Sequence, residues 1–472
     1  MPFEGTAGTL PQAGLRRDIL GFWHIAAQSV ANIAPSATPA LVVALIYGIT
    51  TNGSWLAYVL ATLILLLVAL NVNQFARRSV SPGSLYTFVA QGLGPTWGVI
   101  SGWSMVIAYL IIGGSVLAGC ANYVTVIAHG LVGPKFDGIL TVLAMLIAGI
   151  GAWFIAYRDV KLSTQLMLAI EFVSIALIMT LSFVFFIKRG AVLDNAQLTL
   201  SGVTPANVGH ALVLAIFSYV GFESAASLGH EAKNPLHSIP RSILFTVIAV
   251  GAYFVFTTYV LVMAFHGQNP PLDQSTAPLN VLANLAGIPI FGLLISIGVA
   301  IGFFACALAC ITAGSRVLFT MSRHGLFYAA AGDAHATHAT PHIAVTFAAI
   351  AVLAGPLALL ASHFALLDIF GDLGTLGTLS VLFSYVLVSI AAPVYLYRRG
   401  ELKPSAVIVS VLAVAAMVVA MVGTVLPVPP PPQSYIPAVF LLLLGLGVSR
   451  FLYLRSRDPK IIRDIEADLI AS

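Results

Sequence analysis

Residues Ala31–Leu41 read ANIAPSATPAL and lie inside a run, Ile19–Ala76, that contains no Asp, Glu, Lys or Arg. An apolar run of this length indicates membrane-spanning segments. Pro35 and Pro39 cannot continue one straight helix, because proline lacks a backbone N–H and clashes with the preceding turn. Broken helices are tolerated inside a membrane only where the loose backbone is buried or lines a cavity. The stretch therefore predicts one half of a transport site.

The composition predicts an integral membrane protein. Of 472 residues, 59% are hydrophobic and 8% are charged, whereas soluble domains carry about 25% charged residues. The net charge of +4 does not indicate a nucleic-acid partner, because no basic run is interleaved with aromatic residues. The sequence contains no phosphate-binding or hydrolase motif, so we expect neither an enzyme nor an ATP-driven pump. No cofactor or metal site is predicted, since Cys306 and Cys310 are typical of small buried side chains.

The apolar segments predict the topology. Twelve are long enough to cross a bilayer, at residues 19–49, 54–76, 97–128, 137–157, 163–187, 207–230, 241–265, 288–322, 343–362, 366–397, 404–426 and 434–455. Two amphipathic pieces, 81–93 and 269–286, and a tail, 456–472, lie outside them. Of the 21 Lys and Arg residues, only Lys135, Lys188 and Arg189 fall on one side of this arrangement. The other side is therefore expected to be cytoplasmic, with both termini on it, in the plasma (inner) membrane.

A second interruption occurs in the sixth segment, HALVLAIFSYVGFESAASLGHEAKNP. Ser218 and Gly221 break its apolar pattern just before Glu223. The two interrupted segments are five spans apart, and an odd number of spans per repeat gives two repeats of opposite orientation. Matching interruptions in two halves are typical of a transporter binding site. Kinks that serve only packing are the alternative, which the matched spacing disfavours.

The ends of broken helices predict the chemistry of this site. Thr38 before Pro39 has the form of an N-cap followed by proline at the first helical position. The outer half of span 1 would then present free N–H groups at mid-membrane, and Gly221 would similarly let the inner half of span 6 begin there. The halves that end near Ala34 and Ser218 would present carbonyls. Donors and acceptors around one gap suit a zwitterion.

Three motifs in order resemble the amino acid–polyamine–organocation (APC) superfamily. They are SPGSLYTFVAQGLGPTWGVISGW from residue 81, FSYVGFESAASLGHEAKNPLHSIPR from residue 217, and SRVLFTMSRHGLF from residue 315, followed by Thr340-Pro341. The resemblance implies the leucine-transporter fold: an all-α polytopic membrane protein of 12 transmembrane helices in one domain. Spans 1–5 (19–187) and 6–10 (207–397) would form a 5+5 inverted repeat, and spans 11 and 12 (404–455) would lie outside it.

The resemblance also implies where the substrate lies, namely between broken helices 1 and 6, with spans 3, 8 and 10 closing the site. Phe217 falls where related antiporters place an aromatic lid over the substrate. The residues implied to bind substrate are Ser36, Ala37, Thr38, Met105, Tyr109, Gly113, Phe217, Ser218, Tyr219, Val220, Gly221 and Cys310.

The span-1 stretch departs from the family pattern, which resembles Gly-Ser-Gly. Here Pro35 removes one donor, and Ala37 and Thr38 carry side chains where glycine has hydrogen. We therefore expect a permease for an amino acid or a closely related small amine, with a polyamine- or ethanolamine-type permease as the alternative. From another class, the alternative is a membrane solute sensor without net transport.

Two carboxylates at membrane depth, Glu223 and Glu171, are candidates for proton coupling, because ionisable groups there are costly. For Glu223 the alternative is a structural role, as an acceptor for freed backbone amides. Some proton-coupled relatives carry a lysine in span 5 that stands in for sodium, and Ser174 falls at that position, so this lysine mechanism is not supported. Sodium coupling is not expected either. We expect a proton-coupled carrier or an exchanger, monomeric or homodimeric, whose partners are the small-molecule substrate and the lipid bilayer.

Overall fold

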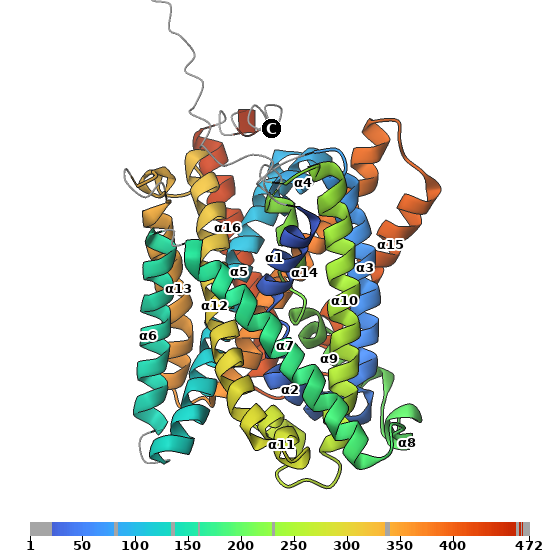
Figure 1. The fold of residues 1–472 in the computed structure, drawn as a ribbon. Helices are drawn as coiled ribbons and strands as arrows, with labels where there is room; N and C mark the ends of the chain where they lie inside the picture. The colour runs from blue at the N-terminus through green and yellow to red at the C-terminus, as the bar shows by residue number, and fades with distance from the viewer. Residues whose placement is uncertain are drawn as a thin grey trace, which may run out of the picture.

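The computed structural model describes residues 21–79, 84–133, 137–158, 161–228, 232–335, 340–458, 462–463 and 465. Its regular elements are helices, and the long ones stand side by side in one bundle (Figure 1). In chain order they are α1 (Phe22–Ile33), η1 (Thr38–Val42), α2 (Val43–Thr50), η2 (Thr51–Gly53), α3 (Ser54–Ala76), α4 (Ser84–Leu93), α5 (Pro95–Val132), α6 (Asp137–Arg158), α7 (Lys161–Arg189), α8 (Asn195–Leu198), α9 (Pro205–Phe217), η4 (Phe222–Leu228), α10 (Pro235–Ala264), η5 (Leu272–Gln274), α11 (Pro278–Leu285), α12 (Pro289–Arg323), η6 (Ala329–Gly332), α13 (His342–Ala361), α14 (Leu366–Arg398), α15 (Pro404–Gly423), η7 (Gln433–Tyr435) and α16 (Ile436–Arg457).

In the described part of the chain, 11 helical stretches are long and apolar enough to cross a membrane. An all-α polytopic membrane protein is thereby confirmed. The number differs from the twelve predicted spans because η1, α2 and α3 count as one stretch, Thr38–Ala76, and α1 has only 12 residues. Thr51, with φ +46°, lies at the turn between α2 and α3. The twelve-span count and the inverted repeat remain predictions.

The longest helices form the centre of the bundle. α5 packs against both α12 and α14, and glycines let these helices approach closely. A Cβ at Gly113 of α5 would lie 3.2 Å from Cys310 Cβ of α12, and one at Gly377 of α14 would contact Ile112 of α5. Small residues are the usual means of close helix contact in membranes, where apolar side chains gain little by leaving lipid.

The two pieces predicted not to span the membrane are short helices. α11 and η5 occupy the 269–286 region, and α4 occupies most of 81–93. Figure 1 places α4 at one end of the bundle and α2, α8 and α11 at the other. Leu85 through Ala90 of α4 are all buried against α5 and α14. The predicted tail, 456–472, lies mostly outside the described residues.

Helices 1 and 6 are both interrupted where the sequence predicts. α1 ends at Ile33, Ala34 has φ +49°, and regular structure resumes as the π-helix η1. α9 ends at Phe217, Gly221 has φ +110°, and the chain continues as the 3₁₀-helix η4. α7 crosses the bundle obliquely (Figure 1) and packs against both α1 and α12. This crossing brings a side chain of α7 to the break in helix 1.

Candidate substrate site between the broken helices

The break in helix 1 is held by Glu171 of α7. Its Oε1 accepts the Ser36 backbone N–H at 2.7 Å, and its Oε2 accepts the Ser36 hydroxyl at 2.8 Å. Both distances are those of well-formed hydrogen bonds. Glu171 is only 3% exposed and Ser36 is fully buried. A carboxylate from another span therefore satisfies the amide that the broken helix leaves free.

Gly302 of α12 makes room for this pair. A Cβ at Gly302 would lie 2.7 Å from Glu171 Oε2 and 3.2 Å from Ser36 Oγ. Atoms that close would have to move, so the carboxylate and hydroxyl lie against this glycine. Spans 1, 5 and 8 thus meet at one point.

The predicted N-cap at Thr38 is wrong. η1 begins at Thr38 itself, Ala37 occupies the cap position, and no side chain caps this end. Proline is at the second helical position, not the first. The Ala37 N–H bonds the Ala34 carbonyl at 2.9 Å, so the break is closed by local backbone bonds and by Glu171. Ala37 and Thr38 are buried beside it.

The break in helix 6 faces the break in helix 1. A Cβ on Gly221 would lie 3.1 Å from the Asn32 carbonyl oxygen and 3.2 Å from its carbon. The Cys306 thiol of α12 donates to the same oxygen, with Sγ at 3.7 Å. Near its end, α1 thus presents one carbonyl to spans 6 and 8. Glycine is required at 221 both for this approach and for the positive φ.

Glu223 is the second buried carboxylate, and four spans converge on it. Its Oε2 accepts the Gly221 N–H at 3.2 Å and the Tyr385 hydroxyl of α14 at 2.9 Å. Tyr109 of α5 and Cys310 of α12 lie close to the same group. Glu223 is 1% exposed, and its Oε1 has no hydrogen-bond partner among the described residues. The structure therefore brings together predicted residues of spans 3, 6 and 8.

Two other predicted residues of span 6, Ser218 and Tyr219, contact α3 through their hydroxyl groups. The Ser218 hydroxyl lies 3.1 Å from Tyr58 Oη, and the Tyr219 hydroxyl lies 2.7 Å from Thr62 Oγ1. Both side chains therefore point to α3. The Tyr219 carbonyl accepts the Phe222 N–H at 3.2 Å. Val220 is half-buried.

Phe217 belongs to a layer of aromatic side chains that several spans contribute. Its ring meets Phe370 of α14 edge-on at 5.5 Å, and Phe370 meets Phe303 of α12 at 5.5 Å. Tyr123 of α5 lies 6.2 Å from Phe303 and donates to the Ala40 carbonyl of η1 at 2.9 Å. The predicted lid residue is thus one member of a layer that joins spans 1, 3, 6, 8 and 10.

Over residues 24–457 the sequence matches the amino acid permease family. The chain belongs to that family. It is 25% identical over 368 residues to a branched-chain amino acid permease of Bacillus subtilis. The aligned region covers 74% of this chain and 75% of the relative. It is 26% identical over 336 residues to a low-affinity putrescine importer of Escherichia coli K12, with 68% and 70% covered. A serine/threonine exchanger of Bacillus subtilis is 25% identical over 300 residues, with 62% and 65% covered. The predicted class, a transporter of amino acids or amines, is confirmed.

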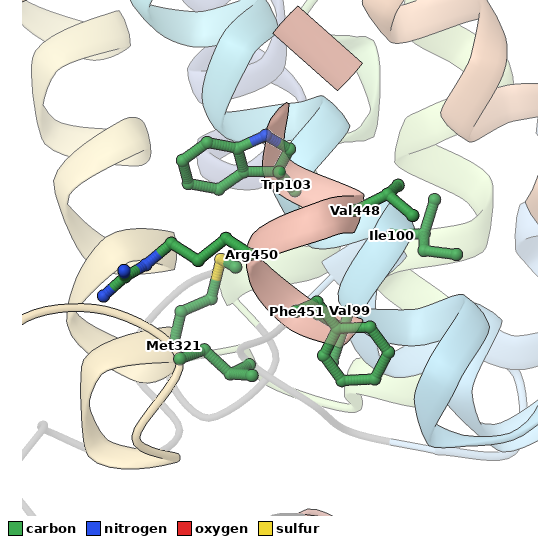
Figure 2. A pocket seen from close by; sticks show the side chains of 9 residues that line it. Val99, Ile100, Trp103, Met321, Val448, Arg450 and Phe451 are labelled. Atoms are coloured by element: carbon green, nitrogen blue, oxygen red, sulfur yellow. The ribbon is translucent and has the colours of Figure 1, made fainter. Parts of the chain in front are cut away.

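The permease also has a cavity away from these residues, between α5, α12 and α16 (Figure 2). Its volume is about 10 Å³, roughly the room that one water molecule needs. Trp103 packs directly on Gly447, and Arg450 points out of the cavity (Figure 2), with its guanidinium 5.7 Å from the Tyr328 ring. This space is too small for an amino acid and serves helix packing.

Sequence reasoning missed four contacts of the two breaks. Asn32 precedes the prolines, and nothing in the sequence marks its carbonyl as the one that meets Gly221. Gly302 and Tyr385 lie in uninterrupted helices, and only their pairing with carboxylates of other spans distinguishes them. The sequence singles out Cys306 only as a neighbour of Cys310. It does not indicate that the Cys306 thiol donates to the Asn32 carbonyl. Met105 of α5, a predicted substrate-binding residue, is buried.

Proposed function

We propose that this permease is a secondary transporter that carries an amino acid or a small amine across the membrane by alternating access. The substrate would lie between the breaks of helices 1 and 6. The observation that carries the proposal is the approach of Gly221 to the Asn32 carbonyl, with a buried carboxylate on each side. Secondary transporters bind their substrates at such interruptions.

The geometry supports separate movement of the inner and outer halves. The outer halves, η1 with α2 and α9, are joined by the aromatic layer around Phe370. The inner halves, α1 and η4, contact each other and α10. Bending at Ala34 and Gly221, the two positive-φ residues of the breaks, would let one set open while the other stays closed.

Proton coupling is assigned to Glu223, with Glu171 as a second carboxylate. Among the described residues, neither forms an ion pair, and Glu223 Oε1 has no donor. A buried carboxylate without a cation is costly to keep ionised. Uptake of a proton, or binding of a cationic group, would relieve that cost. Sodium has no part in this proposal.

The orientation follows from charge. The predicted topology puts all Lys and Arg residues except Lys135, Lys188 and Arg189 on the side of α4, so we place this side in the cytoplasm and the chain in the plasma membrane.

The test is uptake into proteoliposomes of purified protein, with a panel of radiolabelled amino acids and amines and an imposed pH gradient. Saturable uptake that the pH gradient or internal substrate accelerates is expected. No flux of any compound, despite ligand-induced thermal stabilisation, would show a sensor and refute the proposal. Protein-free liposomes provide the control.

A further inference from the structure

We infer that Glu171 is a built-in carboxylate ligand of the helix-1 break and selects against substrates that carry a carboxylate of their own. The preferred substrate is then an amine that lacks this group. The inference rests on the proposed function and narrows its substrate class.

The first step is the occupancy of the donors. Ser36 offers one N–H and one hydroxyl, and each bonds a different oxygen of Glu171, at 2.7 and 2.8 Å. The pairing uses both Ser36 donors at once. Gly302 fits the pair closely, with 2.7 Å between its hypothetical Cβ and Glu171 Oε2. A substrate carboxylate would have to displace Glu171 to reach these donors.

The second step is charge. Glu171 and Glu223 are 3% and 1% exposed, and in the described part of the chain their partners are neutral. A zwitterion would add a third carboxylate where the donors are taken. While Glu171 and Glu223 are ionised they would repel that carboxylate, because like charges in a buried site repel strongly. An ammonium group alone would instead supply the missing positive charge.

The third step is a place for the ammonium. Glu223 Oε1 is buried and accepts no short hydrogen bond among the described residues, and the Tyr109 hydroxyl lies beside this carboxyl. The nearby Asn32 carbonyl accepts only a thiol, at 3.7 Å, among the bonds found there. A thiol is a weak donor, so an ammonium can replace it. The site thus keeps acceptors for a cation while its Ser36 donors are occupied.

The experiment compares compounds that differ by one carboxylate: 1,4-diaminobutane with ornithine, and ethanolamine with serine. Uptake and binding are measured for the wild type and for Glu171→Ala. The wild type should prefer the amine of at least one pair by about tenfold or more, the factor that one charge-assisted hydrogen bond provides. Glu171→Ala should lose this preference by gaining affinity for the amino acid. A wild type that prefers the amino acid in both pairs, or a preference unchanged in Glu171→Ala, overturns the inference.

Gly302→Ala provides a second variant if Glu171→Ala does not fold. Its Cβ should push the Glu171 carboxylate away from Ser36 and narrow the same preference. Gly355→Ala of α13, where a Cβ meets nothing within 4 Å, is the matched control and should behave as the wild type. Transport with a carboxylate preference defeats this inference alone, whereas no transport of any compound defeats the proposed function with it.

Discussion

Substitution of Gly221 by alanine tests the contact between the two broken helices. The residue has φ +110°, which side chains adopt at a cost of about 1–3 kcal/mol. The new Cβ would also lie 3.1 Å from the Asn32 carbonyl oxygen, tighter than most real Cβ contacts. Backbone atoms cannot rotate away, so helices 1 and 6 would have to separate. We expect a lower Tm in detergent and a loss of transport.

Gly94→Ala separates the two costs. Gly94 precedes α5 with φ +94°, and a Cβ there meets nothing within 4 Å. This control carries the conformational cost of about 1–3 kcal/mol without the crowding. Gly221→Ala should therefore be less stable than Gly94→Ala by differential scanning fluorimetry. Its initial uptake rate should also fall by about tenfold or more. A tenfold change corresponds to a free-energy difference of about 1.4 kcal/mol. Equal Tm values and equal uptake in the two variants would refute the reasoning.

Three further predictions concern single side chains. Glu223→Gln should abolish the pH dependence of uptake and keep the fold; a surviving pH profile would make Glu223 structural. Ala37→Trp should abolish substrate binding, measured by scintillation proximity, without aggregation on size exclusion; unchanged affinity would remove the helix-1 break from the site. Hydrogen bonds from Arg78 and Arg399 hold the pKa of the exposed Glu401 carboxyl below its usual value of 4.5. A lowered folded pKa stabilises above the unfolded pKa, and the effect is lost as the pH falls through the folded pKa. The Tm difference between wild type and Glu401→Gln should therefore be present at neutral pH and diminish as the pH falls below 4.5 toward the lower folded pKa; a constant difference would contradict this assignment.

Much of the fold was predictable because it depends on the chemistry of residues that are close together in the sequence. Apolar runs bounded by charges define the spans, and Pro35, Pro39 and Gly221 have backbone requirements that no neighbour can remove. The breaks accordingly fall where the sequence predicts them, after Ile33 and Phe217. Glu223 was predicted because a carboxylate at membrane depth is rare whatever its partners.

The partners of the breaks were not predictable in the same way. Nothing in the sequence around Ser36 indicates that its donors bond Glu171, 135 residues away. The N-cap rule therefore predicted a nearby side chain, Thr38, as the cap. In the structure, Glu171 of another span accepts the free N–H instead. Tyr385 is similar: it lies in an unbroken apolar helix, and only the fold places its hydroxyl 2.9 Å from Glu223. Such contacts depend on how helices pack, which local patterns do not encode.

The chain's own cysteines allow the most direct measurement of where the substrate binds. Cys306 and Cys310 lie at the breaks, and Cys120 lies two turns beyond Gly113 on α5; all three thiols are buried. Alkylation of the three thiols in proteoliposomes can be followed by mass spectrometry, with and without a transported compound from the panel. We predict that the compound slows modification of Cys306 and Cys310 and leaves Cys120 unchanged. If saturating substrate changes the alkylation rate of none of the three cysteines, the result would contradict a site between the broken helices.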